Sequence, residues 1–108
     1  MPLFTILTLF PEAVESYLTA GLLGAARERG LFEIRVIDFR DFARDRHRTV
    51  DDRPFGGGPG MVLKAEPILE CIEWVESAWG VHKKLALCPT GRLFRQGIAA
   101  ELATTDRT

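Results

Sequence analysis

The segment from Asp45 to Met61, DRHRTVDDRPFGGGPGM, places ionisable side chains directly against a run of glycines and prolines. Arginines, aspartates and an imidazole come first, and the nearly bare backbone of Gly56–Gly60 follows. An ordinary surface loop needs only scattered Gly, Pro, Asn or Ser to turn the chain. Guanidinium groups beside an unobstructed backbone therefore favour a site that holds a polyanion.

The charged part of this region is mixed in sign rather than polybasic. Residues 40–53 contain one histidine, His47, and two larger sets: the arginines Arg40, Arg44, Arg46, Arg48 and Arg53, and the aspartates Asp41, Asp45, Asp51 and Asp52. Because aspartates can hold guanidinium forks in fixed directions, the mixture favours contact with phosphates or RNA. The alternative is an interlocked surface salt-bridge network that contributes little. His47 is either a hydrogen-bonding group of such a site or a satisfied structural histidine.

The glycine run gives backbone N–H groups close access to a ligand, since no Cβ blocks them, and the neighbouring prolines limit its freedom. It is not a P-loop, because Met61 follows where that motif requires Lys and then Ser or Thr, and it does not match GxGxxG. We interpret it as a lid or cradle, with a purely conformational loop as the alternative. Asp51 and Asp52 could supply a general base, although adjacent loop residues usually point apart.

Composition places the chain among single globular domains. It has 108 residues, 46% of them hydrophobic, and 14 Lys plus Arg against 15 Asp plus Glu, so any nucleic-acid role must be local. Cys71 and Cys88 lack the spacing of a zinc site or a disulfide framework, which predicts no metal and a reducing cytoplasm. The apolar segment Met1–Phe10 is not preceded by the positively charged residues that begin a signal peptide. No apolar run approaches the ~20 residues that a transmembrane helix needs to cross a bilayer. We expect no membrane association.

The apolar pattern predicts how the first third of the chain is organised. Residues 3–10 form a continuous apolar run, which is typical of a parallel strand covered on both faces. Pro11 then begins a helix that runs to Gly30, with a buried face made of Val14, Leu18, Leu22 and Ala25. Residues 32–39 alternate as a second strand. Strand, helix and strand together predict a right-handed βαβ unit.

The pattern repeats after the glycine run. A helix is predicted from Glu66 to Gly80, with Trp74 and Trp79 as core or interface residues. Residues 85–87 are predicted as a short third strand, followed by a turn at residues 88–91 and a helix with Phe94, Ile98 and Leu102 on one side. The turn lies where open α/β sheets bind ligands, although Pro-Thr-Gly by itself is only a turn. The fold class is α/β, with an open, mostly parallel sheet, flanking helices and an expected further strand that is missing.

Three stretches together carry a resemblance to a known family. They are the segment Asp45–Met61, the letters LFPE at Leu9–Glu12, and LCPTGR at Leu87–Arg92. Together they closely resemble bacterial tRNA (guanine(37)-N1)-methyltransferases. The resemblance covers essentially the whole chain, as the first part of that family.

The resemblance implies a fold and an activity. Residues 1–108 would be the N-terminal portion of a SPOUT-type (trefoil-knot) methyltransferase domain, cytoplasmic and homodimeric. S-adenosylmethionine would be the methyl donor, and guanine N1 of tRNA, next to the anticodon, would be the acceptor. In the family the knot and the aspartate thought to take the N1 proton come later, so this chain is expected to lack the knot region and to be inactive alone. A second hypothesis is a short non-catalytic RNA- or nucleotide-binding module.

Site residues follow from the resemblance position by position. It implies catalytic roles for His47, Arg48 and Asp51, with Asp51 as a substrate-orienting carboxylate. It implies that the wall receiving the target guanosine includes Arg46, Arg53, Gly57, Gly58, Pro59 and Gly60. It implies that the first cofactor-facing loop consists of Leu87, Cys88, Pro89, Thr90 and Gly91. Ala86 and Cys88 stand where relatives commonly have an aromatic and a hydroxyl residue, which affects side-chain contacts but not backbone contacts.

Overall fold

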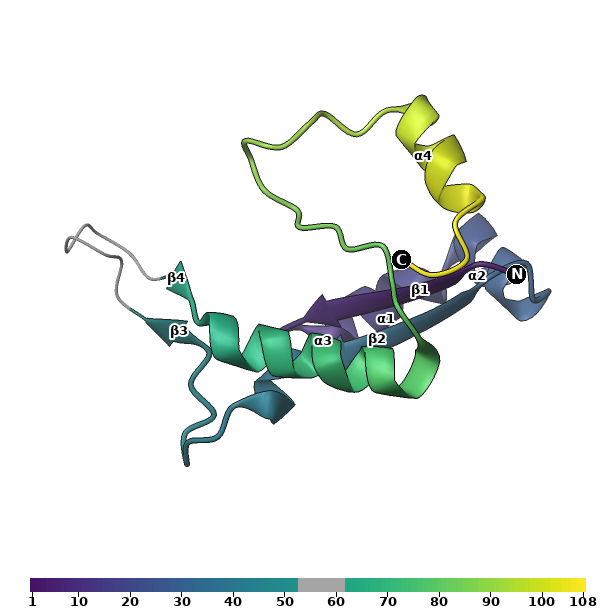
Figure 1. Cartoon of the computed structure of the whole chain (residues 1–108). Coiled ribbons are helices and arrows are strands. Elements are labelled where there is room, and N and C mark those ends of the chain that lie inside the picture. Colours follow the sequence, from purple (N-terminus) through teal and green to yellow (C-terminus); the bar gives the residue numbers. More distant parts are fainter. Residues whose placement is uncertain (53–61) are drawn as a thin grey trace.

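The computed structural model describes residues 1–52 and 62–108. In chain order its elements are β1 (Leu3–Thr8), α1 (Pro11–Leu18), α2 (Gly21–Glu28), β2 (Glu33–Asp38), the 3-10 helix η1 (Phe39–Phe42), β3 (Asp51–Asp52), β4 (Val62–Leu63), α3 (Ala65–Trp79) and α4 (Gln96–Ala103). Figure 1 shows β1 and β2 side by side, with α1 and α2 behind them and α3 in front. The α/β class expected from the sequence is confirmed.

The two long strands form the predicted parallel pair. Their register runs from Leu3 opposite Glu33 to Thr8 opposite Asp38. Arg27 of α2 fastens the crossover, because its guanidinium donates to both carboxylate oxygens of Glu15 on α1, over 2.8 and 3.3 Å. The βαβ unit is therefore closed by a bidentate ion pair as well as by packing.

The prediction of a single helix from Pro11 to Gly30 is wrong, because the structure has two helices, α1 and α2, separated by Thr19 and Ala20. The Thr19 hydroxyl donates to the Ser16 carbonyl over 3.0 Å, and Gly21 adopts a left-handed φ of +60°. Gly24 lies so close to the end of α1 that a Cβ there would be 2.4 Å from the Thr19 carbonyl oxygen. The chain thus turns where small residues let the two helices approach.

This break also changes which side chains are buried. Leu18 is buried and Val14 half-buried, as predicted, but Leu22 is 91% exposed and Ala25 is exposed. The i, i+4 spacing holds within α1 only, because α2 starts with a new helical phase.

The third strand predicted at residues 85–87 is also wrong. Residues 80–88 are irregular, and Leu85 and Leu87 are exposed. The free edge of β1 is occupied instead by residues 106–108. The Leu3 N–H donates to the Asp106 carbonyl over 2.9 Å and the Thr5 N–H to the Thr108 carbonyl over 2.8 Å, and Leu3 and Arg107 form a parallel bridge. Figure 1 shows this end of the chain returning beside β1.

The core lies between the sheet and α3. Its buried members are Phe39, Val50, Cys71 and Val75. The predicted helix over residues 66–79 is confirmed as α3, which ends at Gly80 with a left-handed φ of 94°. Trp79 packs against this cluster, as predicted, and meets Trp74 edge to face with ring centroids 5.4 Å apart, but Trp74 itself is 48% exposed. The helix predicted after the turn is present as α4, with Leu102 buried, but Phe94 precedes this helix and is 66% exposed, so the predicted apolar face is correct only in part.

Within the described residues, no helix is both long enough and apolar enough to cross a bilayer.

Candidate functional site

A tight turn at residues 45–49 presents the predicted arginine and histidine side chains. The Asp45 carboxylate accepts the Thr49 N–H over 2.7 Å and also the Thr49 hydroxyl. The Arg48 N–H closes the turn by donating to the Asp45 carbonyl over 3.1 Å. The Thr49 hydroxyl, followed by its N–H, holds the pKa of Asp45 below its ordinary value, so this carboxylate stays ionised. Asp45 therefore acts as a local organiser of the turn.

The turn fixes Arg48 in two ways. Its backbone has a φ of 52°, in the left-handed region that residues with a Cβ seldom adopt, and its guanidinium pairs with Asp41. Arg44, one residue before the turn, pairs with Glu70 of α3. The surface salt-bridge alternative thus holds for two of the arginines, whereas contact with phosphates or RNA stays a prediction. The exposed Arg46 has no ion pair within residues 1–52 and 62–108.

Val50 joins the turn to the core. Its side chain is 3% exposed and belongs to the cluster around Cys71, and its carbonyl accepts the Lys64 N–H over 2.6 Å. The next residue, Asp51, is exposed and pairs with Leu63 in the short antiparallel β3–β4 ladder. The charged turn at residues 45–49 is therefore anchored at its C-terminal end, first by the buried Val50 and then by the short β3–β4 pair.

An open cavity of about 430 Å³ lies beside the turn. Its walls come from the turn and from the start of α3, and its charged lining residues are Arg44, Asp45, Lys64, Glu66 and Glu70. Charges of both signs face this space, so the lining alone selects no ligand class.

The predicted cofactor-facing loop lies on the arc between α3 and α4. Its turn is closed by the Gly91 N–H, which donates to the Cys88 carbonyl over 3.3 Å, and the Cys88 thiol lies 3.8 Å from the Thr90 hydroxyl. Leu87 is 97% exposed. The backbone N–H groups of residues 85–88 make no hydrogen bond with any described residue. The arc therefore offers apolar surface and open backbone donors together.

The predicted site residues fall into separate places. Arg46, His47, Arg48 and Asp51 gather at one end of the molecule, next to β3 and β4. Figure 1 shows the arc that carries residues 87–91 apart from that end. The remaining predicted substrate residues, namely Arg53, Gly57, Gly58, Pro59 and Gly60, lie outside the described residues. No group of three or more His, Cys, Asp or Glu side chains in the described part of the chain could hold a metal ion.

Sequence reasoning missed the organising roles of Asp45 and Thr49. Their spacing, an aspartate four residues before a threonine, is the signal that could have indicated a side-chain-capped turn. It was hidden among four aspartates and five arginines whose individual partners the sequence does not specify.

Comparison with known proteins decides the family. Residues 2–108 match the family model described as tRNA (Guanine-1)-methyltransferase TrmD. The chain belongs to this family. The resemblance seen in the sequence is thereby confirmed. A solved structure titled "Crystal structure of tRNA (m1G37) methyltransferase from Aquifex aeolicus" is similar at 37% identity with a TM-score of 0.89, covering 98% of this chain and 48% of the Aquifex chain.

Curated relatives in the TrmD family are more similar still. A tRNA (guanine-N(1)-)-methyltransferase of Koribacter versatilis is 50% identical over 94% of this chain and 40% of its own length. The protein of the same name from Geobacter metallireducens is 50% identical over 93% of this chain and 41% of its own length. The chain thus spans about two-fifths of the length of these relatives.

Proposed function

We propose that this chain is the N-terminal part of one SPOUT-type methyltransferase domain, in a protein that methylates N1 of guanine 37 in tRNA. The observation that carries the proposal is the 50% identity over 94% of this chain to a relative named tRNA (guanine-N(1)-)-methyltransferase. The methyl donor is S-adenosylmethionine, and the protein is a cytoplasmic homodimer whose trefoil knot is formed by residues outside this chain. The structural likeness to the Aquifex enzyme, at a TM-score of 0.89, supports the same assignment.

The arc at Leu87–Gly91 has the chemistry that S-adenosylmethionine requires. Open backbone N–H groups can donate to polar atoms of the cofactor, and the exposed Leu87 side chain offers apolar surface to an adenine ring. Leu87 and Cys88 would hold the cofactor through their backbone N–H groups, on a turn that Gly91 closes. The sulfonium of the bound cofactor supplies an electrophilic methyl group.

The turn at residues 45–49 and Asp51 would receive the target nucleoside. Guanine N1 is a weak acid, so its proton passes to a base while N1 gains the methyl group. That base is expected outside this chain. Arg46 and Arg48 lie where guanidinium groups could face phosphates or the guanine O6, on which negative charge develops as N1 loses its proton. Asp51 would orient the base edge by accepting a hydrogen bond. Positioning of the reactants supplies most of the rate gain in such a reaction.

The test compares methyl transfer with cofactor affinity in the full-length protein. We expect Arg48→Gly and Asp51→Ala to lower single-turnover methyl transfer to a tRNA transcript about 100-fold, while the Kd for S-adenosylmethionine changes less than about twofold. Glycine is chosen at position 48 because the left-handed backbone suits it, so the substitution removes the guanidinium without adding strain. Arg29→Ala, at the exposed end of α2, is the matched control and should leave both values unchanged.

Other outcomes would redirect the assignment. Equal losses of methyl transfer and of cofactor affinity would contradict the roles given to Arg48 and Asp51. Full-length wild-type protein that binds tRNA but transfers no methyl group would favour a non-catalytic RNA-binding module. A further variant, Asp41→Asn, releases the Arg48 guanidinium from its ion pair without removing it, and should cost less activity than Arg48→Gly.

A further inference from the structure

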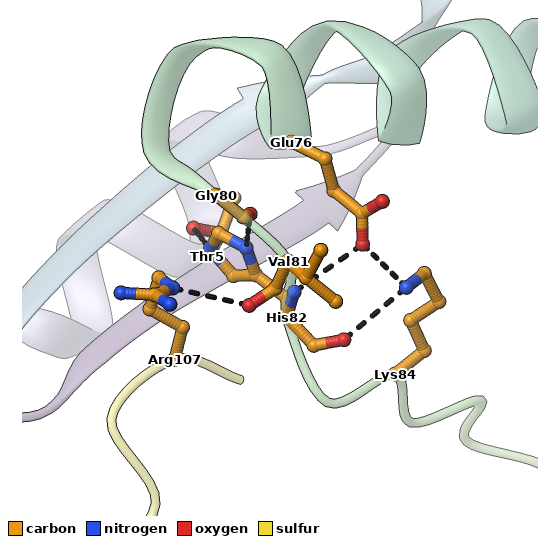
Figure 2. Close-up of polar contacts among 7 residues, drawn as sticks. All are labelled: Thr5, Glu76, Gly80, Val81, His82, Lys84 and Arg107. Atoms are coloured by element: carbon orange, nitrogen blue, oxygen red, sulfur yellow. Dashed lines mark hydrogen bonds and ion pairs between the residues drawn. The ribbon is translucent and has the colours of Figure 1, made fainter.

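His82 is a buried histidine that none of the roles above uses. Its side chain is 8% exposed, and both ring nitrogens have partners, as Figure 2 shows. Nδ1 lies 2.7 Å from the Gly80 carbonyl oxygen, and Nε2 lies 3.1 Å from the Thr5 hydroxyl of β1. The ring therefore bridges the end of α3 and the first strand of the sheet.

The geometry assigns the protonation of the ring. A carbonyl oxygen can only accept, so Nδ1 must carry hydrogen and donate to Gly80. When Nδ1 alone carries the hydrogen, Nε2 is free to accept a hydrogen bond. In that tautomer Nε2 accepts the hydrogen of the Thr5 hydroxyl. Each nitrogen then has one role and one partner.

The backbone of His82 is fixed as well. Its N–H donates to the Glu76 carboxylate over 3.2 Å, and its carbonyl accepts from the Lys84 ammonium over 3.2 Å. Lys84 also pairs with the same Glu76 carboxylate, which closes a ring of contacts visible in Figure 2. This pairing, followed by the His82 N–H, holds the pKa of Glu76 below its ordinary value, so the carboxylate stays charged. All four polar groups of His82 are therefore matched.

The residues on either side of His82 are tied to the end of the chain that lies beside β1. The Arg107 guanidinium donates from Nε to the Val81 carbonyl over 3.0 Å, and the Lys83 N–H donates to the Arg107 carbonyl over 2.9 Å. Beyond Lys84 the backbone N–H groups make no hydrogen bond with a described residue until Gly91 closes its turn. Residues 81–84 are thus the last fixed point before the cofactor-facing arc.

From this arrangement we propose that His82 is a positioning residue: its ring sets the direction in which residues 85–91 leave the sheet, and so presents them to S-adenosylmethionine. The inference rests on the proposed function for the identity of the ligand. It does not depend on that function for the contacts themselves. A segment held at its base loses less conformational entropy when a ligand orders it, so removing the ring should weaken cofactor binding.

The experiment uses the full-length protein with three variants. His82→Ala removes both ring contacts. His82→Asn keeps a donor at the position of Nδ1 but has nothing at Nε2, and Thr5→Val removes only the hydroxyl at nearly constant volume. Thr104→Val, whose hydroxyl bonds only within the end of α4, is the matched control. Hydrogen exchange of the amides at positions 82 and 83, whose hydrogen bonds fix the base of the arc, is measured without ligand, together with the Kd values for S-adenosylmethionine and for a tRNA transcript.

We expect faster exchange of the amides at positions 82 and 83 and a cofactor Kd raised about tenfold in His82→Ala, with smaller changes in His82→Asn and Thr5→Val and a tRNA Kd within about twofold. Should His82→Ala fail to fold, the other two variants carry the test. Unchanged exchange in every variant would overturn the proposal, and so would faster exchange with an unchanged cofactor Kd. If wild-type protein binds no S-adenosylmethionine, the proposed function fails, whereas the exchange data still decide whether His82 fixes the arc. Nitrogen chemical shifts of the His82 ring should show hydrogen on Nδ1, and hydrogen on Nε2 alone would contradict the bridge.

Discussion

Replacing Val50 by alanine tests whether the charged turn depends on the core for its position. Val50 is 3% exposed and packs with Phe39, Cys71 and Val75. The substitution removes two methyl groups, worth about 0.8 kcal/mol each in transfer free energy, and leaves a cavity, so the free energy of unfolding should fall by about 2–3 kcal/mol. In urea this corresponds to a midpoint lowered by roughly 1–2 M, measured on the chain by the fluorescence of Trp74 and Trp79.

Leu22→Ala is the matched control for this experiment. Leu22 is 91% exposed on α2, and leucine and alanine both favour helix, so we expect a change within about 0.5 kcal/mol. The reasoning would be refuted if Leu22→Ala cost more stability than Val50→Ala, because the sequence-based pattern that buried Leu22 would then describe the helix better than the structure. In full-length protein, Val50→Ala should also weaken tRNA binding, since Val50 directly precedes Asp51.

Two further predictions concern titration. The hydrogen bond from Arg27 lowers the pKa of Glu15 below 4.5, so this pair stabilises the fold above about pH 4.5, and that stability is lost as pH falls through the folded-state pKa. Between about pH 5 and pH 3 the melting temperature of the wild type should therefore fall further than that of Arg27→Met. Equal falls in the two melting temperatures would contradict a stabilising Arg27–Glu15 ion pair. Burial, then the charges of Asp41 and Asp38, raises the pKa of the Cys71 thiol to about 11, whereas Cys88 is exposed. Iodoacetamide at about pH 8 should modify Cys88 first by mass spectrometry, and equal modification of Cys71 would contradict its burial.

The elements that the sequence predicted correctly are those whose local signals agree. In β1 and β2 the apolar pattern and the connecting helical segment point to one parallel pair. In α3 the apolar periodicity and the terminal Gly80 point to one helix. The break after Leu18 was missed because the apolar periodicity was followed across it, although it depends on two local glycines: Gly21, which adopts a left-handed φ, and Gly24, which lies close to the Thr19 backbone.

Competition for one sheet edge explains the other error. Residues 85–87 have strand composition, yet residues 106–108 take the edge of β1, and composition does not say which of two distant segments pairs there. The candidate site likewise has a part that the sequence could predict and a part that it could not. An exposed cluster of arginine, histidine and aspartate could be predicted from residue types, but the Asp41 partner of Arg48 and the bridge through His82 join residues from separate elements.

The place of β1 between two partners has a consequence for how the chain folds during synthesis. On one side β1 pairs with β2, which follows after a short crossover, but on the other side it pairs with residues 106–108. The first pairing can form early on the ribosome, whereas the second must wait for the end of this segment to emerge and then close a much longer loop. Until then the apolar strand Leu3–Thr8 keeps one edge unpaired. During that interval this edge is open to misdirected strand pairing in the nascent chain.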